Sequence, residues 1–170
     1  MSVGALSSRC TSGGRPACSG IGLSGTDPHL EKGSIVPKPP VPAAVAEFLA
    51  QPNYATISTL RADGQPVSVP TWYMYENGRI LVNMDEGRKR LEYLRHDPRV
   101  SLSAMDPQDW ITHVSIQGRV VEFVDDPDLA DIDRISTHYT GRPYHQRDRR
   151  RVSAWIEIDH WHAWGRLANA

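Results

Sequence analysis

A short basic segment, Gly87 to Arg90, holds the residues whose types and spacing most clearly permit chemistry. Arg88, Lys89 and Arg90 follow a glycine at the predicted start of a helix. Free backbone N–H groups, the positive end of the helix dipole and guanidinium forks can together bind a phosphate group. Cations at a helix N-terminus oppose the helix dipole, and this cost is easier to explain if an anion normally binds there. An isolated basic run is more often a solvated first turn, so this interpretation depends on the surrounding elements.

A second candidate region is the strand segment Val69, Pro70, Thr71 and Trp72. A proline disturbs strand pairing and leaves backbone groups available, and the Thr71 hydroxyl adds a hydrogen-bonding group. Ordinary core packing is an equally good explanation for Trp72. Asn83, at the end of the next predicted strand, could bond a polar chain or a phosphate, although polar residues at strand ends are commonly solvated.

Other polar sets give weaker signals. The run Arg147 to Arg151 lacks the interleaved aromatic residues typical of nucleic-acid binding, so a solvated basic loop is favoured. His160 and His162 would share one strand face, but no third ligand lies nearby, so no metal is expected. No Ser/His/Asp or Cys/His nucleophile set stands out, and no catalytic residue is assigned. A bound cofactor would then carry the chemistry.

The elements that must position these residues are mostly strands. Alternating apolar residues and turn signals predict six strands, over residues 54–60, 67–75, 80–84, 100–105, 113–124 and 152–159. Short helices are predicted at 42–49, from 88 to 96 and from Asp126 onward, and Gly118 indicates a bulge. Six strands with short helices predict a mainly β fold, a closed or nearly closed antiparallel barrel.

Composition limits the remaining classes. The 170 residues carry a formal net charge of −1, which gives no overall attraction to nucleic acid or anionic lipid. No apolar run reaches the length of about 18 residues that a membrane span needs. Only Cys10 and Cys18 occur, which fits a reducing, cytoplasmic setting. Residues 1–40 are rich in Gly, Ser and Pro and are expected to be a disordered tail before a domain over 41–170.

Three stretches carry a family resemblance: 56–66, 70–73 and 87–102. They resemble the pyridoxamine 5′-phosphate oxidase-like split-barrel superfamily and, within it, the flavin/deazaflavin oxidoreductases of the B type. The clearest motif is Leu94 to Leu102, and the similarity covers most of residues 43–165. The resemblance implies a six-stranded antiparallel split β-barrel of the FMN-binding type. It also implies a homodimer with a cofactor site at the subunit interface.

The resemblance assigns roles to particular residues. Arg88 and Arg90 would be the principal phosphate ligands, with Lys89 between them, and Val69 to Trp72 would lie along the ring system. Trp110 resembles an aromatic contributed across the dimer interface to the cofactor pocket, and burial within its own subunit is the alternative. The arginines of 147–151 could attract the anionic glutamate tail of a deazaflavin coenzyme.

The function implied is that of a cytoplasmic oxidoreductase acting on a small molecule. Reduced coenzyme F420 would deliver a hydride to an activated C=C bond of an enone, quinone or tetrapyrrole-like substrate. One alternative keeps the fold but uses FMN, as an oxidase or reductase. Another is a non-catalytic cofactor or haem carrier. Neither nucleic acid nor a membrane is expected as a partner.

Overall fold

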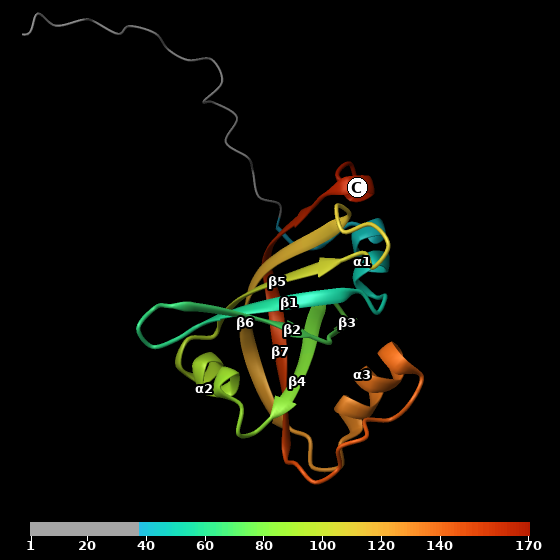
Figure 1. Cartoon of the computed structure of the whole chain (residues 1–170). Helices are drawn as coiled ribbons and strands as arrows, with labels where there is room; N and C mark the ends of the chain where they lie inside the picture. Colours follow the sequence, from blue (N-terminus) through green and yellow to red (C-terminus); the bar gives the residue numbers. More distant parts are fainter. Residues whose placement is uncertain (1–37) are drawn as a thin grey trace, which may run out of the picture. The chain divides into compact units, whose positions relative to one another are not determined.

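Seven strands in one antiparallel sheet form the body of residues 38–170, the part of the chain that the computed structural model describes (Figure 1). Residues 1–37 of the predicted tail lie outside the described residues. In chain order the elements are α1 (Ala43–Leu49), β1 (Tyr54–Leu60), β2 (Pro66–Thr71), β3 (Met74–Glu76), β4 (Arg79–Asp85), α2 (Lys89–His96), β5 (Arg99–Met105), β6 (His113–Asp125), α3 (Ala130–Thr140), β7 (Arg151–Ala163) and η1 (Gly165–Leu167). None of the helices among these residues has the length and apolarity needed to span a bilayer.

The strand order, β2-β1-β5-β6-β7-β4-β3, explains how the sheet curls. Its two outermost members, β2 and β3, are consecutive in the chain and are separated only by Trp72 and Tyr73. The first and last strands of the order therefore meet at this two-residue break. A predicted strand over 67–75 is thus divided in two, which gives seven strands where six were predicted. The split-barrel fold itself is confirmed.

Alternation along the strands sends one set of side chains into a single core. Ile57 of β1, Leu102 of β5 and Ile116 of β6 are fully or almost fully buried, and they are cross-strand neighbours. Leu91 and Leu94 of α2 join the same cluster. Each buried aliphatic side chain of this size contributes about 1.5–3 kcal/mol through the apolar surface removed from water. The core therefore fixes both the strand register and the position of α2.

At the centre of the outer face of β1, β5, β6 and β7, the side chains are polar and carry no permanent charge. Directly opposed residues form two rows across these strands, Thr56–Ser103–Ser115–His162 and Ser58–Ser101–Gln117–His160. Ser103 and Ser115 share a hydrogen bond of 3.3 Å between their hydroxyl oxygens. We call these two rows the polar face.

The bulge predicted at Gly118 is confirmed. The β6–β7 register shifts between Gln117 and Gly118. A Cβ at Gly118 would lie 2.1 Å from the carbonyl oxygen of Glu157, so the two backbones approach too closely for any other residue. The pairing continues beyond this point, and β7 extends to Ala163, four residues past the predicted end.

Helix α3 begins at Ala130 rather than at the predicted Asp126. The Asp126 side chain accepts hydrogen bonds from the backbone N–H groups of Asp131 (3.2 Å) and Ile132 (3.1 Å). It therefore satisfies donors of the first helical turn from a position outside the helix. The Asp126-Pro127 pair signals a helix start, but the chain makes a further turn before the helix begins.

Candidate anion-binding site

A pocket of about 580 Å³ opens where β2, β4 and the start of α2 meet the first residue of β7. Its lining consists of Thr59, Val67, Val69, Pro70, Asn83, Met84, Asp85, Gly87, Arg88, Lys89, Arg90, Tyr93, Tyr144 and Arg151. Four of these side chains are cations and one is a carboxylate. The lining therefore carries an excess of positive charge and suits an anion.

The structure brings six of the nine predicted cofactor-binding residues into this one pocket: Val69, Pro70, Asn83, Arg88, Lys89 and Arg90. The other three lie elsewhere. Thr71 donates its hydroxyl to the carbonyl oxygen of Trp72 (3.0 Å), and Trp72 stacks on Tyr139 with ring centroids 5.3 Å apart. Trp110 is 76 % exposed in the β5–β6 connection. Burial of Trp110 within its own subunit, one of its two interpretations, is therefore wrong.

The Asp85 carboxylate lies at the centre of a cluster of three arginines. It accepts hydrogen bonds from Arg88 Nε (3.2 Å), Arg149 Nη1 (3.1 Å) and Arg151 Nη1 (2.5 Å). Three guanidinium groups thus share one carboxylate, so two positive charges remain uncompensated there. The guanidinium groups repel one another because they lie close together. A bound anion would offset this repulsion, so the cluster attracts one.

Arg90 is the strongest single indication of a ligand. Its Nε is buried without a hydrogen-bond partner among the described residues. Burial lowers the pKa of the guanidinium, and the positive charges of Arg88 and Arg151 lower it further. An arginine stays charged even so. A buried, unpaired charged donor is costly, and a phosphate oxygen in the pocket would satisfy it.

Helix α2 adds backbone donors to the same place. Arg88 is the N-cap of the helix, in an extended conformation, and no side chain caps the first turn. The first N–H groups of a helix have no partner within it. Lys89 turns to Glu92, with Nζ 3.0 Å from Oε2, so its charge is engaged on the helix surface. Arg88 and Arg90 are thus better placed than Lys89 to bind an anion.

Asn83 lines the pocket, but its amide is committed to internal bonds. Its Nδ2 donates to Asp126 (3.1 Å) and Ser153 (3.0 Å), and its Oδ1 accepts from Arg151 Nε (2.5 Å). Ser153 in turn donates to Asp131 (2.7 Å). In this arrangement Asn83 holds Arg151 in position and leaves no amide donor for a ligand.

Arg151 and Asp85 are the important residues that sequence reasoning missed. The side chain of Arg151 is only 6 % exposed, and its guanidinium carbon lies 4.5 Å from the centre of the Tyr144 ring. The prediction of a solvated loop is therefore wrong for Arg151. Arg149 and Arg150 do lie at the surface, paired with Asp85 and Glu86. Arg151 and Asp85 are direct cross-strand partners of β7 and β4, and such pairing cannot be read before the register is known.

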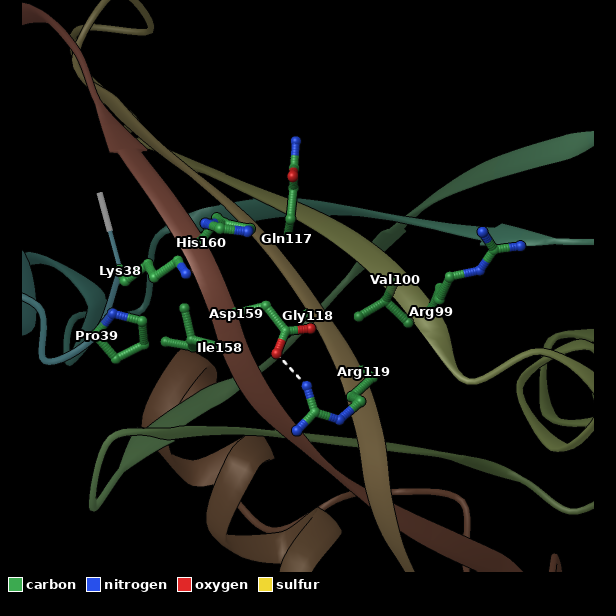
Figure 2. A pocket seen from close by; sticks show the side chains of 10 residues that line it. All are labelled: Lys38, Pro39, Arg99, Val100, Gln117, Gly118, Arg119, Ile158, Asp159 and His160. Carbon is green, nitrogen blue, oxygen red and sulfur yellow. Dashed lines mark hydrogen bonds and ion pairs between the residues drawn. The ribbon is translucent and has the colours of Figure 1, made fainter. Parts of the chain in front are cut away.

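A larger hollow of about 820 Å³ lies beside the polar face, at the bulge between β6 and β7 (Figure 2). None of the predicted cofactor residues lines it. Arg119 pairs with Asp159, as Figure 2 shows, and with Glu157, and Arg99 pairs with Asp97. These two arginines have carboxylate partners, and the third cation of the lining, Lys38, is exposed, so no lysine or arginine of this hollow is both buried and unpaired, and the hollow is a weaker candidate for an anion.

Comparisons with known proteins agree with the fold. The architecture is that of a split barrel of the flavin-binding kind. A family model described as pyridoxamine 5′-phosphate oxidase matches residues 41–165. The chain therefore belongs to the pyridoxamine 5′-phosphate oxidase family. No curated protein matches it at a significant level of sequence similarity.

Solved structures share the fold. One named F420 reductase is 22 % identical, with a TM-score of 0.64, over 71 % of this chain and 98 % of its own. A conserved hypothetical protein of Mycobacterium tuberculosis is 26 % identical, with a TM-score of 0.59, over 77 % and 88 % of the two chains. General stress protein 26 of Bacillus anthracis is 17 % identical, with a TM-score of 0.55, over 71 % and 93 %.

Proposed function

We propose that the protein is a cytoplasmic oxidoreductase in which reduced coenzyme F420 transfers a hydride to an activated C=C bond of a small molecule. The observation that carries the proposal is the buried, unpartnered Nε of Arg90 in a pocket with excess positive charge. Both F420 and FMN bear a phosphate that this pocket suits. Membership of the pyridoxamine 5′-phosphate oxidase family supports redox chemistry on such a cofactor.

Different residues would bind the phosphate and the ring system of the cofactor. Arg88 and Arg90 would hold the phosphate, together with the free N–H groups of α2. Val69 and Pro70 form an adjacent wall on β2, where the ring system would lie. When bound, the reduced deazaflavin supplies the hydride. Asp85 orients Arg88, and the Asn83–Arg151 contact keeps Asp85 itself in place.

The basic loop before β7 favours F420 over FMN. Beside the pocket, Arg88, Arg149 and Arg150 line a further recess of about 470 Å³ together with Asp85 and Glu86. Three cations here face two carboxylates. A deazaflavin carries a glutamate tail beyond its phosphate, and FMN carries none. The recess offers such a tail positive charge next to the proposed phosphate site.

A homodimer is part of the proposal. The polar face lacks permanent charge, as is typical of a surface covered by a partner. At one end of this face Tyr54, Trp110 and Trp164 are 66 %, 76 % and 53 % exposed. Trp110 lies outside the pocket of its own chain, which supports a contribution to the site of a second copy.

Equilibrium titration of the purified protein with F420 and with FMN tests the cofactor. We expect tight binding of F420 and weaker binding of FMN. Tight binding of FMN without binding of F420 would make the protein a flavin enzyme and sink the choice of deazaflavin. Binding of F420 without turnover of enones, quinones or biliverdin-like compounds would instead indicate a cofactor carrier.

A further inference from the structure

One side chain of α3 contacts both residues of the break between β2 and β3. The Tyr139 hydroxyl accepts a hydrogen bond from the backbone N–H of Tyr73 (3.4 Å) and donates one to the carbonyl oxygen of Asn53 (2.9 Å). Its ring stacks on Trp72 at an interplanar angle of 16°. Trp72 and Tyr73 lie outside the strand ladder, so their backbone groups need partners of another kind.

Tyr139 is well suited to this role. The Tyr139 hydroxyl is protonated at neutral pH and donates to Asn53, and burial raises its pKa further, from 10 to about 12. The Tyr73 side chain is fully buried in the barrel and keeps the break close to the core. The Tyr139 hydroxyl thus joins the break to Asn53, the residue just before β1.

The other end of α3 is fixed at the anion pocket. Asp126 accepts from the first turn of the helix and from Asn83 Nδ2, and Asp131 accepts from Ser153. The same Asn83 accepts from Arg151, which also donates to Asp85. An 11-residue helix is about 16 Å long. Helix α3 therefore connects the floor of the pocket to the break in the barrel wall.

We propose that Tyr139 is a positioning residue: by holding the break that follows Thr71, it fixes the end of β2 whose Val69 and Pro70 line the pocket where the cofactor ring would lie, and α3 ties this end to the phosphate end of the site. The proposal rests on the proposed function, because it needs a ring along β2. It predicts that the hydroxyl of Tyr139 affects the environment of the ring more than the affinity for the phosphate.

The variant Tyr139→Phe tests this, since it keeps the ring stack and removes only the hydroxyl. In the cofactor-free protein, amide hydrogen exchange of Tyr73 should become roughly fivefold faster, as the loss of one hydrogen bond implies. With F420 bound, the emission maximum of the coenzyme should shift while its dissociation constant changes by less than about threefold, because the phosphate contacts are intact.

Tyr75→Phe is the matched control, because it removes a hydroxyl from β3, two residues beyond Tyr73. It should leave Tyr73 exchange and coenzyme emission as in the unmodified protein. If Tyr139→Phe also leaves both unchanged, Tyr139 only packs and the proposal is overturned. If the protein binds neither F420 nor FMN, the proposed function fails. The exchange of the Tyr73 amide still reports separately on the contact between Tyr139 and the break.

Discussion

The anion pocket beside α2 and the hollow beside the polar face differ in the burial of their unpaired positive charge more than in size. The hollow is the larger, about 820 Å³ against 580 Å³. Its arginines, Arg99 and Arg119, are each paired with carboxylates at the surface. At the pocket, Arg88 and Arg151 of the lining share Asp85 with the neighbouring Arg149, and a buried donor of Arg90 has no partner among the described residues. Unsatisfied charge, rather than volume, distinguishes the better candidate for an anion site.

The largest expected effect contrasts a buried arginine of the pocket with an exposed arginine of the hollow. Arg151→Met removes the buried partner of Asp85, which is itself only 7 % exposed. Arg88 and Arg149 still pair with Asp85 in this variant, so the loss of unfolding free energy comes from the buried hydrogen bonds of Arg151 to Asp85 and Asn83 and is about 1.5–3 kcal/mol. Arg119→Met removes exposed pairs worth less than about 1 kcal/mol. Urea unfolding of both variants measures the difference, and equal losses would refute the contrast.

A second prediction concerns the recess next to the pocket. Replacing Arg149 and Arg150 together by Ala should weaken F420 binding about tenfold, because it removes the positive charge facing the glutamate tail. The affinity for FMN should change by less than about twofold, because FMN lacks that tail. Parallel titrations of the double variant with both cofactors measure the two changes. A comparable loss for both cofactors would show that these arginines act on the phosphate and not on a tail.

The smallest effect concerns acid stability at the hollow. Hydrogen bonds from the Arg99 side chain and backbone hold the pKa of Asp97 at about 2, below its ordinary value of 3.8. A carboxyl whose pKa is lowered by folding stabilises the protein above its unfolded pKa, and this stability is lost as the pH falls toward 2. Asp97→Asn should therefore flatten the fall in thermal stability between about pH 4 and 2. An unchanged pH profile would show that this exposed pair contributes nothing.

Much of the fold follows from local patterns. The predicted strand over 54–60 is observed with the same bounds, because β-branched alternation and the Asp63-Gly64 turn agree with the tertiary structure. The break at Trp72 and Tyr73 is not visible in the sequence, because β-branched and aromatic residues continue through it. The barrel wall opens there because the chain passes from pairing with β1 to pairing with β4.

The candidate site likewise contains some residues that the sequence predicts and others that it does not. Arg88 to Arg90 are adjacent in sequence and follow a strand, so their convergence is predictable. Arg151 and Asp85 are far apart in the chain and meet only through the β4–β7 register. The role proposed for Trp110 requires a second copy of the chain, which local sequence does not specify.

The central claim is that Arg88 and Arg90 hold the phosphate of the cofactor. The most direct test is a fluorescence titration of F420 against two double variants, Arg88→Ala with Arg90→Ala and Arg99→Ala with Arg119→Ala. Loss of two charge-assisted bonds predicts at least about a hundredfold weaker binding for the first. The second, at the hollow, should bind within about twofold of the unmodified protein. Unchanged affinity in the first double variant would contradict the account.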